Sequence, residues 1–428
     1  MKHIPNINYT TSHNLCTGCG VCKMACPFGA IEIRVKDGCF RPYINSEKCR
    51  NSSGCHRCYS TCPGINVALN AEAENLYPNN NKDFLLGNYI SCFSGYSNNH
   101  EIRLHSASGG LVSQFLIYLL KKKYIDGAIV TKFDCNSTLK VKTFIATTPE
   151  DILAARSSKY GPVHFGNVAQ MVKESGLSRL VIVGLPCHIE GLRKYERSDK
   201  ALSSKIIGHF AIYCSSSRSY YLTEYVCKER GFRPNQLTDF AYRDNGCLGN
   251  MIATYDDNGQ KRIWEEPFES YYQSLASFFV PTRCKLCMDH YGELADISFG
   301  DIHIEPYIQD KIGVNSIVVR NHEWLALFKK MSEEGYVSID EIDPQIVNES
   351  QPMAKVKKNR NFVFGNIRKH IGLKAPVYDT NSKAIINLHY IKWYIASNCQ
   401  HFIGFHKWMW WLIPYVKVKV KIKNLRNN

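Results

Sequence analysis

The sequence predicts an α+β module rich in cysteine, followed by a larger α/β domain with a mostly parallel sheet. Three observations lead to this fold class. Nine cysteines fall within residues 16–62, helix-like and strand-like patterns alternate between residues 87 and 350, and 428 residues exceed what one small core requires. We therefore expect four parts: the cysteine-rich module at 1–76, a linker at 77–86, the α/β domain at 87–353 and a C-terminal extension at 354–428.

The first cysteine group has the spacing C-x2-C-x2-C-x3-C-P, in the segment LCTGCGVCKMACP. Its members are Cys16, Cys19, Cys22, Cys26 and Pro27. This spacing is typical of bacterial two-cluster ferredoxins, in which three thiolates bind one [4Fe–4S] cluster and the fourth binds the other cluster. Gly18 and Gly20 leave room for the loop to close around the inorganic sulfur atoms.

A second group repeats the pattern with a longer first gap, in EKCRNSSGCHRCYSTCPG. Its members are Cys49, Cys55, Cys58, Cys62 and Pro63. We predict a crossed arrangement, in which the last cysteine of each group completes the cluster of the other. The two ligand sets are then Cys16, Cys19, Cys22 and Cys62, and Cys49, Cys55, Cys58 and Cys26. Zinc sites also use C-x2-C pairs, but the doubled run and the two prolines favour iron–sulfur clusters.

The segment YPNNNKDF, at 77–84, is predicted to be a linker because its Asn and Pro residues favour turns. Beyond it, GGLVSQFLIYLLKKKY and YYLTEYVCKERGF have helical apolar spacing, whereas IDGAIVTKF and RLVIVG are short runs typical of buried strands. Such alternation favours parallel strands joined by helices.

A third set of thiols lies within this α/β pattern. Cys187 follows the strand-like run VIVG, Cys214 ends another apolar run, and Cys284 and Cys287 form a C-x2-C pair. Loops after strands are where open α/β sheets bind ligands, so these four thiols could converge on one further cluster. The remaining cysteines are interpreted as packing residues: Cys39, Cys92, Cys135, Cys227, Cys247 and Cys399.

Taken together, these pieces resemble the family of coenzyme F420 hydrogenase/dehydrogenase beta subunits. The resemblance runs from Cys16 to Asp301 and includes HSASGGLVSQFLIYLLKKKYIDGAIV, SSKYGPV, GLPCHIEGLRKY and RCKLCMDHYGELADISFGD, in the order found in the family. It implies an α+β ferredoxin-like N-terminal module and a larger α/β domain that binds flavin and an iron–sulfur cluster. The ligands implied for this third [4Fe–4S] cluster are Cys187, Cys214, Cys284 and Cys287.

The resemblance also implies FAD. The turn that it assigns to flavin contact consists of Ser106, Ala107, Ser108, Gly109 and Gly110, and a second stretch near the flavin consists of Ser158, Lys159 and Tyr160. A glycine pair at the start of a helix can expose backbone N–H groups to a phosphate, although alone it is an ordinary helix start. Asp296 and Asp301 are interpreted as strand-end turn residues, Arg193 and Lys194 as a solvated helix face, and no catalytic residue is assigned.

These features predict a flavoprotein oxidoreductase that passes electrons from a ferredoxin or another redox protein, through [4Fe–4S] clusters, to FAD and a two-electron acceptor. F420 or another small molecule that accepts hydride would be that acceptor. Two alternatives stay open: an electron-transfer subunit without its own substrate, and an accessory protein of polysaccharide biosynthesis at the membrane surface.

The positive charge is concentrated at the C-terminus. Of the net charge of +15, residues 354–428 contribute 15 Lys and Arg against one acidic residue, so the remainder is nearly neutral and does not indicate a nucleic-acid-binding protein. Trp408, Trp410 and Trp411 and the alternating Lys417, Lys419, Lys421 and Lys423 could contact an anionic leaflet, or form a core and an edge strand. No secretory signal is evident at the start, so a cytoplasmic location is expected, with peripheral membrane contact allowed by the tail.

Overall fold

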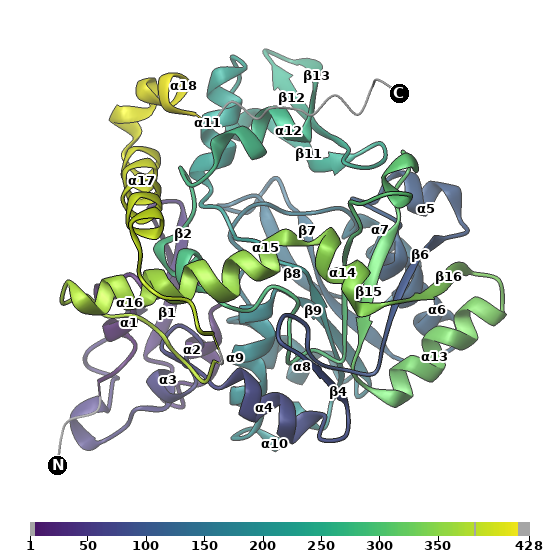
Figure 1. Ribbon diagram of the computed structural model, residues 1–428, viewed down its shortest axis with the longest axis horizontal. Coiled ribbons are helices and arrows are strands. Elements are labelled where there is room, and N and C mark those ends of the chain that lie inside the picture. Colours follow the sequence, from purple (N-terminus) through teal and green to yellow (C-terminus); the bar gives the residue numbers. More distant parts are fainter. Residues whose placement is uncertain (1–4, 381, 418–428) are drawn as a thin grey trace.

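The protein, represented by a computed structural model that describes residues 5–380 and 382–417, is built around an eight-stranded sheet (Figure 1). The strands, in spatial order, are β16 (Val337–Ile342), β6 (Ser91–Ser97), β15 (Asn315–Val319), β14 (Ile297–Asp301), β10 (Ile206–Ile212), β9 (Leu180–Gly184), β7 (Gly127–Phe133) and β8 (Val141–Ala146). Two of the predicted strand segments, IDGAIVTKF and RLVIVG, are β7 and β9.

The sheet is mixed. Its centre, β7, β9, β10 and β14, pairs in parallel, whereas β8, β15, β6 and β16 add antiparallel pairs at the two sides. The strands therefore run mainly in one direction, as predicted, but parallel pairing is confined to the centre. This centre determines the site, because parallel strands deliver their carboxyl ends to the same edge of the sheet.

Helices and loops cover both faces of the sheet, so its central strands are buried on both sides. On one face α6 (Leu111–Lys121), α7 (Pro149–Ala154) and α13 (His322–Glu333) enclose a core in which Phe115, Phe210 and Trp324 are in contact. On the other face lie α8 (Val168–Ser175), α9 (Pro186–Glu196) and α10 (Lys200–Ser203). The predicted helices within GGLVSQFLIYLLKKKY and YYLTEYVCKERGF are confirmed as α6 and α11 (Tyr221–Glu229).

The N-terminal module packs directly on this second face. It comprises α1 (Asn8–Ser12), α2 (Val21–Met24), the hairpin β1 (Ile31–Lys36) and β2 (Cys39–Ile44), α3 (Arg57–Ser60), β3 (Asn66–Val67) and α4 (Leu69–Leu76). Val21 belongs to the same apolar core as Ile182 and Ile189, and α2 contacts α9 where Gly191 leaves room for Val21. The module and the large domain therefore share a core.

The segment that was expected to be a linker is packed in place. Tyr77 is buried, and its hydroxyl donates to the carbonyl oxygen of Leu294 and to Asp296 at 3.3 and 3.2 Å. The following residues form a hairpin of β4 (Asn81–Asp83) and β5 (Gly87–Tyr89). The polar composition thus marks a turn between two packed units and not a free tether.

A smaller sheet of β11 (Leu237–Asp244), β12 (Asn250–Asp257) and β13 (Gln260–Pro267) lies beside the main sheet (Figure 1). It is antiparallel and packs with α11 and α12 (Phe268–Tyr271) around an aromatic core. Trp410 is part of that core and is buried. For this one of the three tail tryptophans, the structure agrees with the alternative in which the tryptophans form a core.

The C-terminal extension folds back over the molecule. After α14 (Pro344–Ser350) the chain forms α15 (Pro352–Val356), a π-helical turn at Lys357–Asn361, α16 (Phe362–His370), β17 (Val377–Tyr378), α17 (Leu388–Phe405), a 3-10 segment at Lys407–Leu412 and α18 (Ile413–Val416). β17 pairs in parallel with β3 of the N-terminal module. The alternating Lys419, Lys421 and Lys423 lie outside the described residues.

Candidate metal centres

The first predicted ligand set surrounds one cavity of about 310 Å³. Cys16, Cys19 and Cys22 reach it from the loop before α2 and from α2 itself, and Cys62 reaches it from the turn after α3. Gly18 and Gly20 both have φ of 80°, a backbone conformation that residues with a Cβ atom avoid. A Cβ atom on Gly20 would also lie 2.7 Å from the backbone nitrogen of Gly166, so this loop needs glycine to approach the large domain.

The second predicted set lies next to the first. Burial raises the pKa of the Cys58 thiol, and Cys26, Cys49 and Cys55 lie close enough to raise it further. Burial likewise raises the pKa of Cys22, with contributions from the other members of the first set and also from Cys58. The structure thus brings together the two crossed groups, with Cys22 and Cys58 at the boundary between them.

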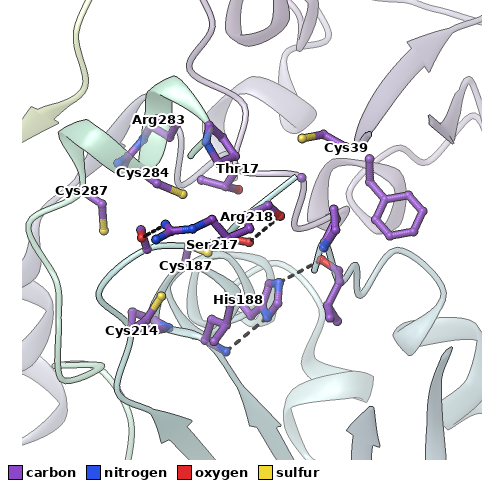
Figure 2. Close-up of a pocket in the computed structure, with 18 of the residues that line it drawn as sticks. Thr17, Cys39, Cys187, His188, Cys214, Ser217, Arg218, Arg283, Cys284 and Cys287 are labelled. Carbon is purple, nitrogen blue, oxygen red and sulfur yellow. Dashed lines mark hydrogen bonds between the residues drawn. The ribbon is translucent and has the colours of Figure 1, made fainter. Parts of the chain in front are cut away.

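The third set lines a larger cavity of about 660 Å³ between the N-terminal module and the large domain (Figure 2). Cys187 lies in the first turn of α9, just after β9, and Cys214 follows β10. Because β9 and β10 are parallel neighbours, their ends place these two thiols side by side. Cys284 and Cys287 come from the 3-10 turn Thr282–Leu286 and its end, on the opposite wall in Figure 2.

The cavities of the first and third sets share a wall. Thr17, Gly18 and Phe40 line both. Burial raises the pKa of the Cys187 thiol well above its usual value, and among the neighbouring charges Cys19 of the first set adds most to this effect. Cys39, which was expected only to pack, also lines the third cavity (Figure 2).

Arg283 ties the third set to the first. Its side chain is buried, and it donates to the carbonyl oxygens of Gly64 and Pro63 at 3.2 and 2.8 Å and to the hydroxyl of Tyr378 at 2.8 Å. It is the residue directly before Cys284, while Pro63 and Gly64 directly follow Cys62. One guanidinium therefore fixes the distance between a ligand turn of each set.

Lys357 is a second cation at the third set, supplied by the C-terminal extension. Its amine is buried and donates to the carbonyl oxygen of Cys214 at 2.8 Å and to that of Asp289. Burial alone would lower the pKa of this amine, but Cys287, Cys214 and Asp289 outweigh burial and raise the pKa. The π-helical turn places Asn361 beside it, and the amide of Asn361 donates to the carbonyl oxygen of Cys287 at 2.7 Å.

Two further buried groups, Arg218 in the wall of this cavity and Glu190 beyond Cys187 on α9, have unused hydrogen-bonding atoms. Arg218 lies among the thiols in Figure 2, donates to Ser216, and has no partner for Nε within the described chain. Glu190, one turn after Cys187, has no partner for either carboxyl oxygen among the described residues, and burial raises its pKa, which favours the neutral acid. Neither residue could be identified from the sequence, because an isolated Arg or Glu belongs to no recognisable motif.

The first and third sets fit iron–sulfur clusters better than single ions. Within residues 5–380 and 382–417, no group of three or more His, Cys, Asp or Glu side chains is arranged to hold one metal ion. Each thiolate of a four-iron cluster binds a different iron, so the cysteines stand around a volume instead of a point. The two cavities provide such a volume, and the unpartnered Nε of Arg218 suits an anionic cluster.

The two segments assigned to flavin contact also lie together, across the buried Arg243. Arg243 donates to the carbonyl oxygen of Ala107, to the hydroxyl of Tyr160 at 3.5 Å and to Asp301 at 2.7 Å. Asp301 also bonds His303 at 3.1 Å. The carboxylate is therefore held in a buried ion pair, in addition to lying at a strand end.

The polar groups of these segments are engaged within the chain. Ser106 and Ser108 donate their hydroxyls to the carbonyl oxygens of Ile102 and Val314 at 2.6 and 2.8 Å. The amine of Lys159 donates to three carbonyl oxygens, and burial lowers its pKa to about 7. The backbone N–H of Leu111, the first residue of α6, donates to Oδ1 of Asn315 at 3.1 Å. These residues in their present positions do not fit a flavin phosphate.

Close packing also explains one glycine of the predicted flavin turn. A Cβ atom on Gly109 would lie 2.7 Å from the carbonyl oxygen of Gly95. Gly110 has φ of 75° and precedes α6, which requires the left-handed conformation that glycine adopts readily. Both glycines are therefore required by the fold itself.

Two minor predictions are wrong. Arg193 is not on a solvated face: it is largely buried, forms an ion pair with Asp296 at 3.2 Å and donates to the carbonyl oxygen of Leu294. Asp296 also accepts from the backbone nitrogen of His209, so it has a structural role at the N-terminal module's docking surface. Cys399, expected to be buried, is exposed on α17.

Taken together, a ferredoxin-type cysteine module packed on a mixed α/β domain, with a further cysteine-lined cavity between them, defines an iron–sulfur protein of the oxidoreductase type. Residues 9–32 match the 4Fe-4S binding domain. Residues 92–170 match the N-terminal part, and residues 177–345 the C-terminal part, of the coenzyme F420 hydrogenase/dehydrogenase beta subunit. The chain belongs to this family, which confirms the resemblance found from its motifs.

Known relatives agree with this assignment. The coenzyme F420 hydrogenase subunit beta of Methanococcus voltae is 28% identical over 308 residues, covering 68% of this chain and 99% of that protein. The coenzyme F420-dependent sulfite reductase of Methanocaldococcus jannaschii is 24% identical over 351 residues, and the match spans 79% of this chain but about half, 49%, of the reductase.

A solved structure shows the same fold. A chain of the F420-reducing [NiFe] hydrogenase complex from Methanosarcina barkeri superimposes with a TM-score of 0.54 at 21% identity, covering 69% of this chain and 98% of that chain.

Proposed function

We propose that the protein is an iron–sulfur oxidoreductase whose three cysteine sets each hold a [4Fe–4S] cluster. The observation that carries this proposal is the third cavity, where four thiols from three separate regions of the chain meet beside the first set. When bound, each cluster supplies a carrier of one electron at a time. The residues of the chain hold these carriers in sequence, from the set of Cys58 through that of Cys22 to that of Cys187.

The surrounding residues support transfer in that order. The first and third cavities share a wall at Thr17 and Gly18, and Arg283 clamps Cys284 against the turn after Cys62. Buried cations at Arg218 and Lys357 offset the negative charge of thiolates in a low-dielectric site. Cys26, Cys49 and Cys55 of the second set are partly exposed, and we propose this end of the N-terminal module as the side at which an external redox protein docks.

Cysteine variants test this proposal. The double substitution Cys284→Ser and Cys287→Ser should remove one of three reducible centres while the signals of the N-terminal pair persist. Cys135→Ser is the matched control, because that cysteine is partly exposed and does not line the third cavity. The readout is a reductive titration of anaerobically purified protein, followed by electron paramagnetic resonance. An unchanged set of signals in the double variant would show that no cluster occupies the third cavity.

FAD is the second cofactor of the proposal. It rests on the family motifs and on the meeting of the Ser106–Gly110 turn and the Ser158–Tyr160 stretch at Arg243, whose guanidinium is already paired with Asp301. Binding there requires Ser106 and Ser108 to exchange their carbonyl partners for the ligand. Extraction and quantification of flavin from the purified protein tests this, with one FAD per chain expected. Protein that retains all its iron but carries no flavin would remove FAD from the proposal.

The acceptor is proposed to be F420 or another compound that accepts two electrons, with a ferredoxin or another redox protein as the donor. The support is that relatives are named for F420. Reduction of F420 by the pre-reduced protein, followed by absorbance, tests it. Turnover with a different acceptor and none with F420 would change the substrate and leave the iron–sulfur assignment intact. A subunit that only passes electrons to a partner enzyme is the second candidate, because several relatives are named as subunits.

A further inference from the structure

Large apolar side chains gather on the outside of the C-terminal extension. Among the described residues, 19 large hydrophobic side chains are exposed, and 12 of these lie between Ile371 and Val416. Scattered exposed hydrophobic residues need no explanation, but a concentration in one short part of the chain marks an interaction surface.

One face of α17 accounts for the centre of this surface. Leu388, Ile391, Ile395 and Phe402 are 65%, 37%, 56% and 51% exposed. Their spacing of three, four and seven residues places them on a single side of the helix. The opposite side, with Tyr390 and Tyr394, packs against the α16 core, where Tyr394 meets Phe364 edge to face. α17 therefore has two apolar faces: one packs on the protein, and the other is exposed.

The surface continues beyond α17. Trp408, Trp411 and Tyr415 are 71%, 65% and 80% exposed. Trp410 anchors this segment, since its ring is buried against Tyr225 and Phe279 and its indole donates to the carbonyl oxygen of Gly404 at 2.9 Å. In Figure 1, α17 and α18 form the yellow outer edge of the molecule. We define the α17–α18 face by Leu388, Ile391, Ile395, Phe402, Trp408, Trp411 and Tyr415.

The segment that carries this face is basic, and one of its lysines, Lys407, is paired with Glu224 of α11. Residues 380–428 contain eight Lys and Arg and no Asp or Glu. Lys392 on α17 and Lys417 after α18 are exposed. A basic segment beside exposed Trp, Tyr, Phe and Leu side chains is the combination that anionic lipid headgroups attract. No described helix is long and apolar enough to cross a bilayer, so contact would be with the surface alone.

We propose that the α17–α18 face binds the surface of an anionic lipid bilayer. The apolar side chains enter the interfacial region, the tryptophan and tyrosine rings lie at headgroup level, and the basic residues neutralise lipid charge. Exposed tryptophan and tyrosine rings beside basic residues are typical of membrane interfaces, which favours a bilayer over a protein partner. The match to the beta subunit family also ends at residue 345, before this face begins.

Vesicle sedimentation with the full chain tests the proposal. The protein should pellet with vesicles of phosphatidylcholine and phosphatidylglycerol, and pellet roughly ten-fold less with phosphatidylcholine alone or at high salt. The double variant Ile395→Asp and Phe402→Asp should weaken binding by roughly ten-fold or more, because two exposed apolar side chains that would enter the interfacial region become charged. Ile263→Asp is the matched control, since Ile263 is 66% exposed on β13 and outside the face.

The result is interpretable whether or not the redox proposal holds, because iron content is measured on every variant as a check of folding. Binding to anionic vesicles that is lost in the double variant and retained in Ile263→Asp supports the proposal. Equal sedimentation with neutral and anionic vesicles, or none with either, overturns it. A change in oligomeric state by light scattering that the double variant abolishes, without lipid binding, would assign the face to a second protein copy instead.

Discussion

At the scale of single residues, the third cavity depends on a lysine from outside the cysteine motifs. Lys357 is buried, donates to the carbonyl oxygens of Cys214 and Asp289, and stands beside three of the four thiols. Lys357 is far from those cysteines in sequence, and it reaches them because the C-terminal extension folds back over the molecule. It is a positioning residue, because it acts on the backbone that carries the ligands.

Replacing this amine should shift the redox behaviour of the third centre. Lys357→Met removes a positive charge next to the cluster site, so addition of an electron becomes less favourable and the reduction potential should fall. Retention of iron at this site should also fall, by roughly 10-fold to 100-fold, as is typical when partners of metal ligands are lost. Spectroscopically monitored redox titration and iron analysis measure both quantities.

The controls separate charge from packing. Lys357→Arg keeps the charge and should restore most of the potential, whereas Lys355→Met changes an exposed lysine two residues away and should have no effect. A third centre whose potential is the same in Lys357→Met as in the parent protein would contradict the assigned role.

At the scale of single residues, the sequence could predict those ligands that follow a fixed local spacing. Cysteine ligands close to one another in sequence, such as Cys16, Cys19 and Cys22, are recognisable because loop geometry requires fixed gaps. Lys357 and Arg283 act through long-range contacts that leave no spacing rule, although the position of Arg283 directly before Cys284 was a usable signal. Arg193 was misplaced for the same reason, since its partner Asp296 lies about one hundred residues away.

At the scale of elements, the site follows from two neighbouring parallel strands. The apolar runs that became β9 and β10 were evident, and each is followed by a cysteine. Their adjacency was expected from the general rule that ligands lie at the carboxyl ends of such strands. The antiparallel strands β15, β6 and β16 were not anticipated, because pairing between β6 and β15 joins segments more than 200 residues apart.

The close contact of α17 with Phe278 leads to a prediction at the scale of elements. A Cβ atom on Gly404 would lie 1.7 Å from the carbonyl oxygen of Phe278, so Gly404→Ala should push α17 away and destabilise the protein by about 1–3 kcal/mol. Gly365→Ala on α16 is the matched control, because its Cβ atom would lie 3.8 Å from its nearest neighbour, Ala375, and alanine should stabilise that helix by about 0.5–1 kcal/mol.

Urea unfolding followed by tryptophan fluorescence measures both changes, since Trp410 reports on the seat of α17. Gly404→Ala should lower the midpoint and expose Trp410 early, and Gly365→Ala should leave the midpoint unchanged or raise it. If both variants shifted the midpoint in the same direction and by the same amount, the close approach at Gly404 would not be what holds α17 in its position.

At the scale of the whole molecule, three cysteine sets extend from a partly exposed edge of the N-terminal module to a cavity between the two domains. The module shares the core of α9 with the large domain, and β17 pairs with β3, so the relative position of the sets is fixed by packing on both sides. Composition alone suggested separate units joined by a linker. Burial of Tyr77 shows why that interpretation was incomplete, since polar turns also connect units that share a core.

The most direct test of this account is the iron and sulfide content of the full chain, purified without oxygen and without reconstitution. Three four-iron clusters predict about twelve iron and about twelve sulfide per chain. About eight of each would leave the third cavity without a cluster and contradict the proposed electron path. Zinc in place of iron, or protein without sulfide, would contradict the account as a whole.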